Sequence, residues 1–583
     1  ITLGGPIVKD RTFFFAAFEG RQRRESGFFT GSIFGSGESA LTGSVTVPAA
    51  LGGQTYNFLT PLQVQRATAL LGSNPALAVA YLTLASSGSR TALFGTNSLI
   101  SPGGTFGVPA GQVIGPRFLL TGTPVPVTSV NGAGEPIAFR PLTALERVFP
   151  IRDKTHYFSV RGDHSFNEAN QFTARFSYNP GKVSGIQVES QNQSLGQNDF
   201  SRTGITDIKD TSLSAGLISN LSGNVLNEFT FSYGKRKTSF RSQNNDAVAY
   251  NISDTAFIGR ELFSPVSRTE NRFQFKDNIN WVIGNHSLKF GGDVNFIEIP
   301  SATFELNFSG LFNFGNFAAT NLNPAFVGVP DFTPVQSYGL GLPSIYIQGF
   351  GNPRSQIKNK PIAFFGQDSW RVNNRLTVNY GVRYDVEFTE TIAPVGFRDP
   401  LTGITLSASD IQAAQDAVGV QQGIPRDNNN FAPRLGFAYD VFGNSKTVLR
   451  GSIGLYYDHP LLAIAFNSDI ADAAQQQQAV LTAGSPAPTA LFNASQVFQG
   501  TVCGVQGSVP GICGATVTPG VAASAQYQFG RQRFNDQTFT GFGAVLPFTL
   551  PIAKDFKYAS ATQANATIEQ QLTKDMSLSV GYI

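Results

Sequence analysis

Apolar and polar residues alternate along many short segments of this chain. In Leu376–Phe388, one set of alternate positions reads Leu, Val, Tyr, Val, Tyr, Val, Phe, and the other reads Thr, Asn, Gly, Arg, Asp, Glu. Successive side chains of a β-strand point to opposite faces, so each such segment is predicted to be a strand with one apolar and one polar face. We expect a first strand at Arg11–Gly20 and then strand pairs near Tyr157–Tyr178, Thr211–Gly234, Phe273–Glu298, Ile362–Phe388, Pro433–Asp458 and Thr562–Ile583.

The connections between these segments alternate in length. Within each pair a turn of about three to five residues joins the strands, and several turns carry the Asn or Gly that tight hairpins favour. Successive pairs are separated by roughly 30 to 100 residues, which is long for a compact domain and argues against a soluble sandwich or propeller. The alternation predicts a transmembrane antiparallel β-barrel with short periplasmic turns and long extracellular loops. Strand lengths of about 9–13 residues fit a tilted membrane crossing.

The composition agrees with an all-β membrane protein. Charged residues are 14% of the chain, against about 25% in a typical soluble domain, yet hydrophobic residues are only 41%. Alternation hides a lipid-facing surface from average hydropathy, which reconciles the two figures. No apolar run reaches the roughly 18 residues that a transmembrane helix needs. The net charge of +3 is small and dispersed, so nucleic acid is not an expected partner.

The sequence carries no motif of enzyme chemistry. Patterns for a nucleophile elbow, a phosphate loop, a zinc-protease helix and a calcium loop are all missing, so we expect no catalytic, cofactor-binding or metal-binding residues. A barrel hydrolase would need a nucleophile beside a histidine, and the four histidines are scattered. His164 and His286 are predicted to lie in the barrel wall or at an interface, and metal binding is the less favoured alternative. Asp427–Asn430 could offer oxygen atoms to calcium, but a solvated turn is the favoured interpretation.

Charged residues on the polar strand faces form a second pattern. In a barrel with an apolar exterior these faces line the lumen. We expect the charges to pair mainly with one another and with the plug of such a barrel, and ligand contact is the alternative. The set is Arg161, Asp163, Arg175, Asp293, Arg383, Asp385, Glu387, Arg434, Asp440 and Arg450.

Two loop features lie near the end of the chain. Cys503 and Cys513 have nine residues between them in a Gly-rich stretch, which supplies too few ligands for a metal site. A loop disulfide in an oxidising compartment is predicted, and two unpaired thiols are the alternative. The polar, Ala-rich stretch Gln475–Gln499 is predicted to form a short helix.

Several segments resemble TonB-dependent outer-membrane receptors, and most closely the Oar-like branch, in which a carboxypeptidase-regulatory-like domain precedes the plug. They occur in family order along nearly the whole chain, at Gly4–Phe15, Ser159–Phe166, His286–Asp293, Phe364–Val372, Asn430–Asp440 and Leu578–Ile583. Such receptors are plugged barrels of about 22 strands. The resemblance therefore implies that residues 1–583 are an incomplete barrel domain of about 13 strands, without the plug and the C-terminal strands. The chain also opens on Ile1 without a leader, which is expected of a fragment.

The resemblance implies TonB-dependent active uptake of a large or scarce substrate, such as a glycan, a peptide or a metal chelate. The location would be the outer membrane of a Gram-negative-type bacterium. The partners would be outer-membrane lipid, an extracellular small-molecule or polymer ligand, and a TonB-type energising complex that acts through the missing N-terminal part. Long extracellular loops are expected at about 21–154, 299–361 and 459–561. A passive porin, or a surface adhesin or binding barrel without energy coupling, is the alternative.

Overall fold

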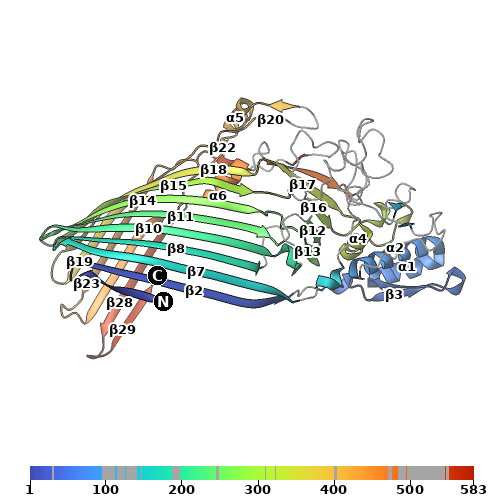
Figure 1. The fold of residues 1–583 in the computed structure, drawn as a ribbon, viewed down its shortest axis with the longest axis horizontal. Helices are drawn as coiled ribbons and strands as arrows, with labels where there is room; N and C mark the ends of the chain where they lie inside the picture. Colours follow the sequence, from blue (N-terminus) through green and yellow to red (C-terminus); the bar gives the residue numbers. More distant parts are fainter. Residues whose placement is uncertain are drawn as a thin grey trace.

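The computed structural model describes residues 1–28, 32–94, 112–113, 125–126, 141–145, 148–186, 197–243, 249–308, 310–321, 324–398, 404–470, 476–483, 494, 545–546 and 551–583. One antiparallel sheet of 14 strands dominates these residues, with its strands in chain order (Figure 1). They are β1 (Thr2–Val8), β2 (Thr12–Phe28), β7 (Val148–Asn167), β8 (Asn170–Ile186), β10 (Gly204–Ser222), β11 (Val225–Ser242), β14 (Val266–Ile283), β15 (His286–Phe304), β18 (Arg354–Arg371), β19 (Leu376–Thr389), β23 (Asn430–Asp440), β24 (Thr447–Tyr457), β28 (Ser560–Gln571) and β29 (Ser577–Tyr582). The predicted all-β antiparallel architecture is confirmed.

The first strand of this sheet was not predicted. Thr2–Val8 forms β1 and pairs with β2, with Gly4 opposite Phe15 and Pro6 opposite Phe13. Glycine and proline are depleted in strands, so the Gly-Gly-Pro run conceals this one. Proline is tolerated here because β1 lies at an edge of the sheet, where one row of backbone groups has no ladder to complete. The observed 14 strands therefore replace the expected count of about 13.

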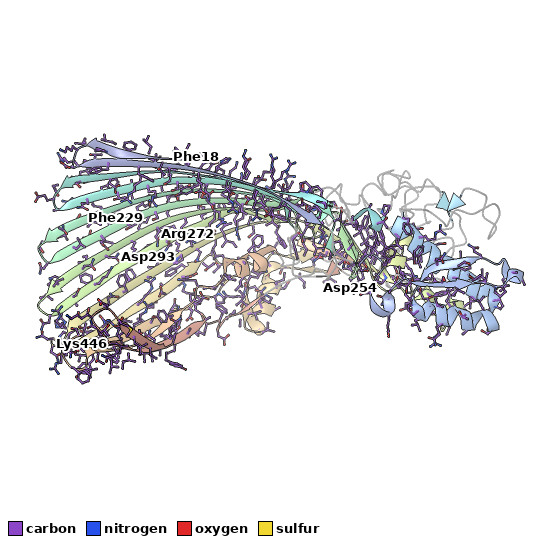
Figure 2. The ribbon with its side chains drawn as sticks, turned by 90° about the horizontal axis from the view of Figure 1, so that it is seen from below. Phe18, Phe229, Asp254, Arg272, Asp293 and Lys446 are labelled. Carbon is purple, nitrogen blue, oxygen red and sulfur yellow. The ribbon has the colours of Figure 1, made fainter. Side chains whose placement is uncertain are left out.

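Short turns join neighbouring strands in pairs, and all these turns lie at the same end of the sheet (Figure 1). The pairs are β1–β2, β7–β8, β10–β11, β14–β15, β18–β19, β23–β24 and β28–β29. We call the end where these turns lie the short-turn end. Figure 2 shows Lys446, from the β23–β24 turn, at this end and Asp254 beyond the opposite, long-loop end. The sheet curls strongly, yet β1 and β29 do not pair with each other, so the sheet is open along one line.

The strands run well past the predicted limits. β7 has 20 residues and β15 has 19, where about 9–13 were predicted from a membrane crossing. Near the long-loop end, β11 carries Lys235, Arg236 and Lys237 in succession, so charge occupies both faces. The alternation used for prediction therefore stops before the strand does. Backbone pairing continues there, and Arg236 lies 3.6 Å from the Asp210 carboxylate of β10.

One face of the sheet is an apolar band. Neighbouring strands place rings beside rings: Phe231 and Phe275 have centroids 5.2 Å apart, and Tyr233 and Phe273 are 4.8 Å apart. Side chains on this face are exposed to the surroundings; Phe364, for example, is 57% exposed. An apolar surface of this extent is not stable in water and marks a face that another apolar phase covers. We call it the outward face and the opposite one the inward face.

The long connections fold together into a cap beyond the long-loop end (Figure 1). It contains the hairpin β3 (Gly43–Thr46) and β4 (Thr55–Leu59), the helices α1 (Pro61–Ser73), α2 (Pro75–Phe94) and α4 (Pro334–Leu340), and a 7-stranded sheet. In spatial order, that sheet is β26 (Val545–Leu546), β25 (Gln476–Thr482), β17 (Ile345–Gly351), β16 (Leu311–Phe314), β12 (Ala249–Ile252), β13 (Ala256–Ile258) and β9 (Gln197–Asn198). The helix predicted within Gln475–Gln499 is wrong for its first part, because Gln476–Thr482 pairs along its whole length with β17.

The cap has a conventional hydrophobic core. Most of its large buried side chains are aromatic, and Phe332 and Tyr346 are fully buried. The Tyr81 ring of α2 stacks on Phe332 at 5.6 Å, and its hydroxyl donates to the Pro330 carbonyl. Side chains from connections far apart in sequence thus bury one another, which makes the cap a folded unit.

A smaller group of segments, the inner lobe, lies near the long-loop end, and its helix α6 packs against the inward face. It comprises α5 (Ala408–Ala417), α6 (Leu462–Ile470) and the pair of β22 (Val420–Gln421) with β27 (Ile552–Ala553). Ala465 of α6 packs in a buried cluster with Ile299 of β15 and Ile357 of β18. Two further two-stranded ladders are β5 (Gln112–Val113) with β6 (Val125–Pro126) and β20 (Phe397–Arg398) with β21 (Thr405–Leu406). Among the described residues, no helix combines the length and apolar character needed to span a membrane.

Candidate functional site: the inward face and its cap

Pairing registers place the predicted lumenal charges on one face. Arg161 of β7 lies opposite Arg175 of β8. Arg434 of β23 lies opposite Gly381 of β19, and Gly381 is on the same polar face of β19 as Asn379 and Arg383. The same registers bring the apolar residues of these strands together on the outward face. The sheet therefore assembles residues from many strands into one polar, charged wall.

Many charges of this wall are paired, as predicted. Arg161 and Asp163 are 2.7 Å apart, and Thr173 donates to the same carboxylate at 2.7 Å. Arg383 and Asp385 are 2.9 Å apart on β19. A solvent-accessible pair such as Arg161–Asp163 contributes about 0–1 kcal/mol, so its effect is to orient side chains more than to stabilise the sheet. Other members of the set also have partners: Asp293 accepts from Gln274 and Asn295, Arg450 pairs with Glu569, and Asp440 accepts backbone hydrogen bonds within the β23–β24 turn.

A groove of about 700 Å³ crosses the inward face from β15 to β28. Its cations are Lys289, Arg383, Arg434 and Arg450. Gly381 lies in its lining, where a larger residue would clash, because a Cβ there would lie 2.7 Å from the Gly366 carbonyl oxygen. Such a groove can hold anionic or hydroxyl-rich groups through charge-assisted hydrogen bonds.

Two of these cations are not neutralised within the described part of the chain. Lys289 and Arg434 have no carboxylate at ion-pair distance among the described residues. The Arg434 guanidinium instead lies over the Tyr456 ring, 4.4 Å from its centroid. This stacking fixes the side chain while leaving its hydrogen-bond donors available.

On the long-loop side of the groove, polar contacts hold α6 of the inner lobe against the wall. Glu387 of β19, which is 2% exposed, accepts a hydrogen bond from Asn359 at 2.9 Å and is bonded to His459 just before α6. The hydrogen bond to Glu387 raises the pKa of His459 above its ordinary value. Ser355 of β18 bonds to Asp469 of α6. These contacts hold α6 at the upper end of the inward face.

The segment Asp427–Asn430 is part of this attachment, and its prediction as a solvated turn is wrong for its two end residues, although Asn428 and Asn429 are exposed. Asp427 is 2% exposed and accepts the backbone N–H of Tyr558 at 3.0 Å, while Asn430 is fully buried. Asp427 is buried because it accepts a hydrogen bond from the backbone of Tyr558, which lies more than a hundred residues further along the chain. No group of three or more metal-ligating His, Cys, Asp or Glu side chains occurs within the described ranges.

The base of the cap contains buried ion pairs that the sequence did not reveal. Arg260 and Glu305 are 2.7 Å apart, and Arg202 lies 4.0 Å from Glu261. Arg202 is fully buried, stacks at 4.0 Å on Phe257, and donates to the Arg260 carbonyl. Burial lowers the pKa of Arg202 to about 10. This network joins three separate connections at the top of the wall.

The remaining predicted residues have clear positions. His164 and His286 lie in the wall on the outward face, where His164 contacts the Thr12 hydroxyl at 2.9 Å. Cys503 and Cys513 lie outside the described residues.

The chain matches the family described as "Outer membrane beta barrel domain" over residues 1–583. It is therefore a member of this family of outer-membrane β-barrel domains, and it is located in the outer membrane of a Gram-negative-type bacterium. The outward face is then the lipid-facing side. The short-turn end faces the periplasm and the cap faces the exterior, as is general for such barrels.

Similar solved structures include the Escherichia coli outer-membrane transporter YddB (11% identity, TM-score 0.37, 74% of this chain and 39% of that one). Others are the copper transporter OprC (11%, 0.34, 75% and 52%) and the ferripyoverdine receptor of Pseudomonas aeruginosa (12%, 0.35, 74% and 50%). The chain thus covers less than two thirds of the length of each of these proteins. No curated protein matches the chain.

Proposed function

We propose that this chain is the barrel wall of an outer-membrane receptor that takes up an extracellular ligand by TonB-dependent transport, as in the Oar-like branch. The observation that carries the proposal is the cationic groove of the inward face, which lies below a packed cap. A purely structural wall has no need for an arginine without an ion-pair partner. Arg434 has no such partner within the described chain; it is fixed by stacking on Tyr456 and lines the groove.

The cap and inner lobe would act as the capture surface. Their segments come from connections that include the proposed extracellular loops at about 21–154, 299–361 and 459–561 of the barrel domain at residues 1–583. A ligand bound there would pass along the inward wall, where Arg434 and Lys289 can hold anionic or hydroxyl groups. Glycans, peptides and metal chelates all present such groups, so the proposal keeps these three substrate classes. The energising complex would act through a plug domain on the N-terminal side.

The open line between β1 and β29 supports the proposal that further strands complete the barrel. Both edge strands carry unpaired backbone N–H and C=O groups, and such groups cost several kcal/mol each when they face lipid. Additional strands from the same gene product would satisfy them and enclose the groove. An intact barrel of about 22 strands would then place the inward face around a plugged lumen.

The proposal is tested with the full-length protein in two assays. In liposome swelling with raffinose, a gated receptor gives no swelling, whereas a passive porin does. In cells, deletion strains lacking this gene, the energising complex or both are grown on a glycan, a peptide or a metal chelate as the limiting nutrient. The same growth defect on one nutrient in all three strains supports energised uptake. Swelling with raffinose, or uptake that survives loss of the energising complex, overturns it in favour of a porin. Surface attachment that is lost without any growth defect points to an adhesin.

The groove itself is tested by substitution. Arg434→Gln is expected to reduce uptake about tenfold, the effect of removing one charge-assisted hydrogen bond. The matched control is Arg21→Gln, because Arg21 is an exposed arginine on the same sheet with a 3.8 Å partner, outside the groove. Equal uptake by the two variants would remove the groove from the ligand path.

A further inference from the structure

A polar cluster lies on the lipid-facing side of the wall, close to the periplasmic end. Asp368 of β18 is 4% exposed, and its Oδ2 accepts a hydrogen bond from the Tyr380 hydroxyl at 2.9 Å. The same oxygen lies 2.6 Å from Nδ1 of His286. The imidazole stacks flat on Trp370 at 5.5 Å, with 9° between the ring planes. A buried carboxylate on a lipid-facing surface is costly, so its partners and purpose need an explanation.

The cluster stands at the depth of lipid head groups. His286 is the first residue after the β14–β15 turn, and Trp370 is the residue opposite it, just before the β18–β19 turn. Tryptophan and tyrosine favour this interfacial depth. Residues that lie opposite one another on neighbouring strands form a row across the outward face. The row that contains Asp368 is the next one from His286 and Trp370 toward the middle of the membrane.

An apolar groove of about 660 Å³ adjoins the cluster on its membrane side. The groove exists because Gly366, which lies between Phe290 and Val382 in the next row, has no side chain. A Cβ at Gly366 would meet nothing within 4 Å. Leucine, phenylalanine and valine side chains from β15, β19 and β23 form its walls, with Leu288, Phe290, Val382 and Leu435 among them.

The chemistry of the two parts is complementary to a glycerophospholipid. The carboxylate of Asp368 can only accept, so Nδ1 of His286 is the donor in their contact. In the doubly protonated ring, Nε2 also carries a hydrogen, and it makes no hydrogen bond within the described part of the chain. The side chain of His286 is 39% exposed, which leaves this donor accessible to an anionic oxygen.

We propose that this surface binds one glycerophospholipid of the inner leaflet. The phosphodiester accepts a hydrogen bond from Nε2 of His286, Asp368 and Trp370 hold the imidazole in place, and one acyl chain lies in the groove over Gly366. A dedicated lipid at this point would seal the wall where the Gly366 row leaves a gap. The site differs from the inward groove, which opens on the opposite face of the same strands.

The test uses the full-length protein in detergent and native mass spectrometry, with dioleoyl-phosphatidylglycerol and monogalactosyl-dioleoylglycerol as probes. These lipids share their acyl chains, and only the first has a phosphate. The wild type is expected to bind the phospholipid about tenfold more tightly, the value of one hydrogen bond to a charged group. His286→Gln should remove this preference while both lipids still bind. Gly366→Leu should weaken both lipids about tenfold, since burying roughly two methylene groups fewer has that effect.

The control is Ala174→Leu, a comparable enlargement on the outward face of the distant strand β8, and it should change neither affinity. Equal affinity of the wild type for both lipids, or an unchanged preference in His286→Gln, would overturn the phosphate site. Unaltered binding in Gly366→Leu would overturn the acyl groove. If Gly366→Leu does not fold, the comparison of the wild type with His286→Gln still decides the proposal.

Discussion

Gln63 of α1 and Gln336 of α4 exchange two amide hydrogen bonds across 273 residues of sequence, at 2.7 and 2.9 Å, and both side chains are fully buried. Each glutamine is also the third residue of its own helix. Each accepts the backbone N–H of a capping threonine, Thr60 or Thr333, at 3.0 Å. One amide pair thus closes two capping boxes and joins two connections of the barrel wall.

Loss of one partner should loosen both helices at once. Gln63→Ala leaves the Gln336 amide buried without its partner, which costs about 1–3 kcal/mol. Hydrogen exchange should therefore accelerate in α1 and in α4, although only α1 carries the substitution. Gln65→Ala, at an exposed position of the same helix, is the control. The paired replacement Gln63→Leu with Gln336→Leu should be closer to the wild type than either single change. Acceleration confined to α1 would show that the pair does not couple the two connections.

The close approach of α2 and α4 depends on two glycines. A Cβ at Gly339 would lie 1.8 Å from the Gly88 carbonyl oxygen, and a Cβ at Gly88 would lie 2.8 Å from the Gln336 carbonyl. Gly339→Ala should separate the helices and make the cap sensitive to limited proteolysis. Gly72→Ala, in α1 with nothing within 4 Å of its Cβ position, should be stabilised by about 0.5–1 kcal/mol. Proteolysis of Gly339→Ala at the rate of Gly72→Ala would argue against this packing.

The buried Arg202–Glu261 pair should be sensitive to removal of one member. Arg202→Met removes the cation that lies 4.0 Å from Glu261, which is 1% exposed, and breaking a buried pair costs about 3–5 kcal/mol. The cap should then lose protection from hydrogen exchange around β13 and at residues 199–203. Arg21→Met, which breaks an exposed pair, should change stability by no more than about 1 kcal/mol. Similar effects of the two substitutions would contradict the role given to burial.

The attachment of α6 should weaken at alkaline pH. His459 has a raised pKa in the folded protein, because Glu387 bonds to it and Asp385 lies nearby, while partial burial and Arg383 act in the opposite direction. Its contribution is therefore fully present below the ordinary pKa of about 6.5 and is lost as pH rises through the raised value. A spin label on Leu461→Cys, an exposed position just before α6, should become more mobile above that value. His459→Gln should remove the pH dependence; a persistent dependence in this variant would assign it to another group.

The sequence predicted the wall better than the cap, and the reason is physical. Alternation in β19 is a local signal, because each residue reports the face on which it lies. β1 escaped prediction since Gly4, Gly5 and Pro6 belong to an edge strand, where their weak strand preference is tolerated. The cap is stabilised by contacts between distant connections, which no window of sequence contains. A signal was nevertheless present, since Thr60-Pro61-Leu62-Gln63 and Thr333-Pro334-Val335-Gln336 are the same helix-start motif.

The candidate site shows the same division. Ten charges of the inward face were predicted by residue from strand alternation, but Lys289 of the groove was not among them. Arg202 and Asp427 were not, because burial of a charge depends on partners such as Glu261 and Tyr558 that come from other connections. Polar residues in a long connection have no periodicity from which their burial could be predicted.

The account depends most on the sheet being a membrane wall with its short turns in the periplasm and its cap outside. The direct measurement is labelling of intact cells with a membrane-impermeant maleimide, using the full-length protein with Cys503 and Cys513 replaced by serine. Gln65→Cys in the cap should be labelled in intact cells, whereas Glu168→Cys in the β7–β8 turn should be labelled only after the outer membrane is permeabilised. Labelling of Glu168→Cys in intact cells, with Gln65→Cys protected, would contradict the orientation and the proposed path of the ligand.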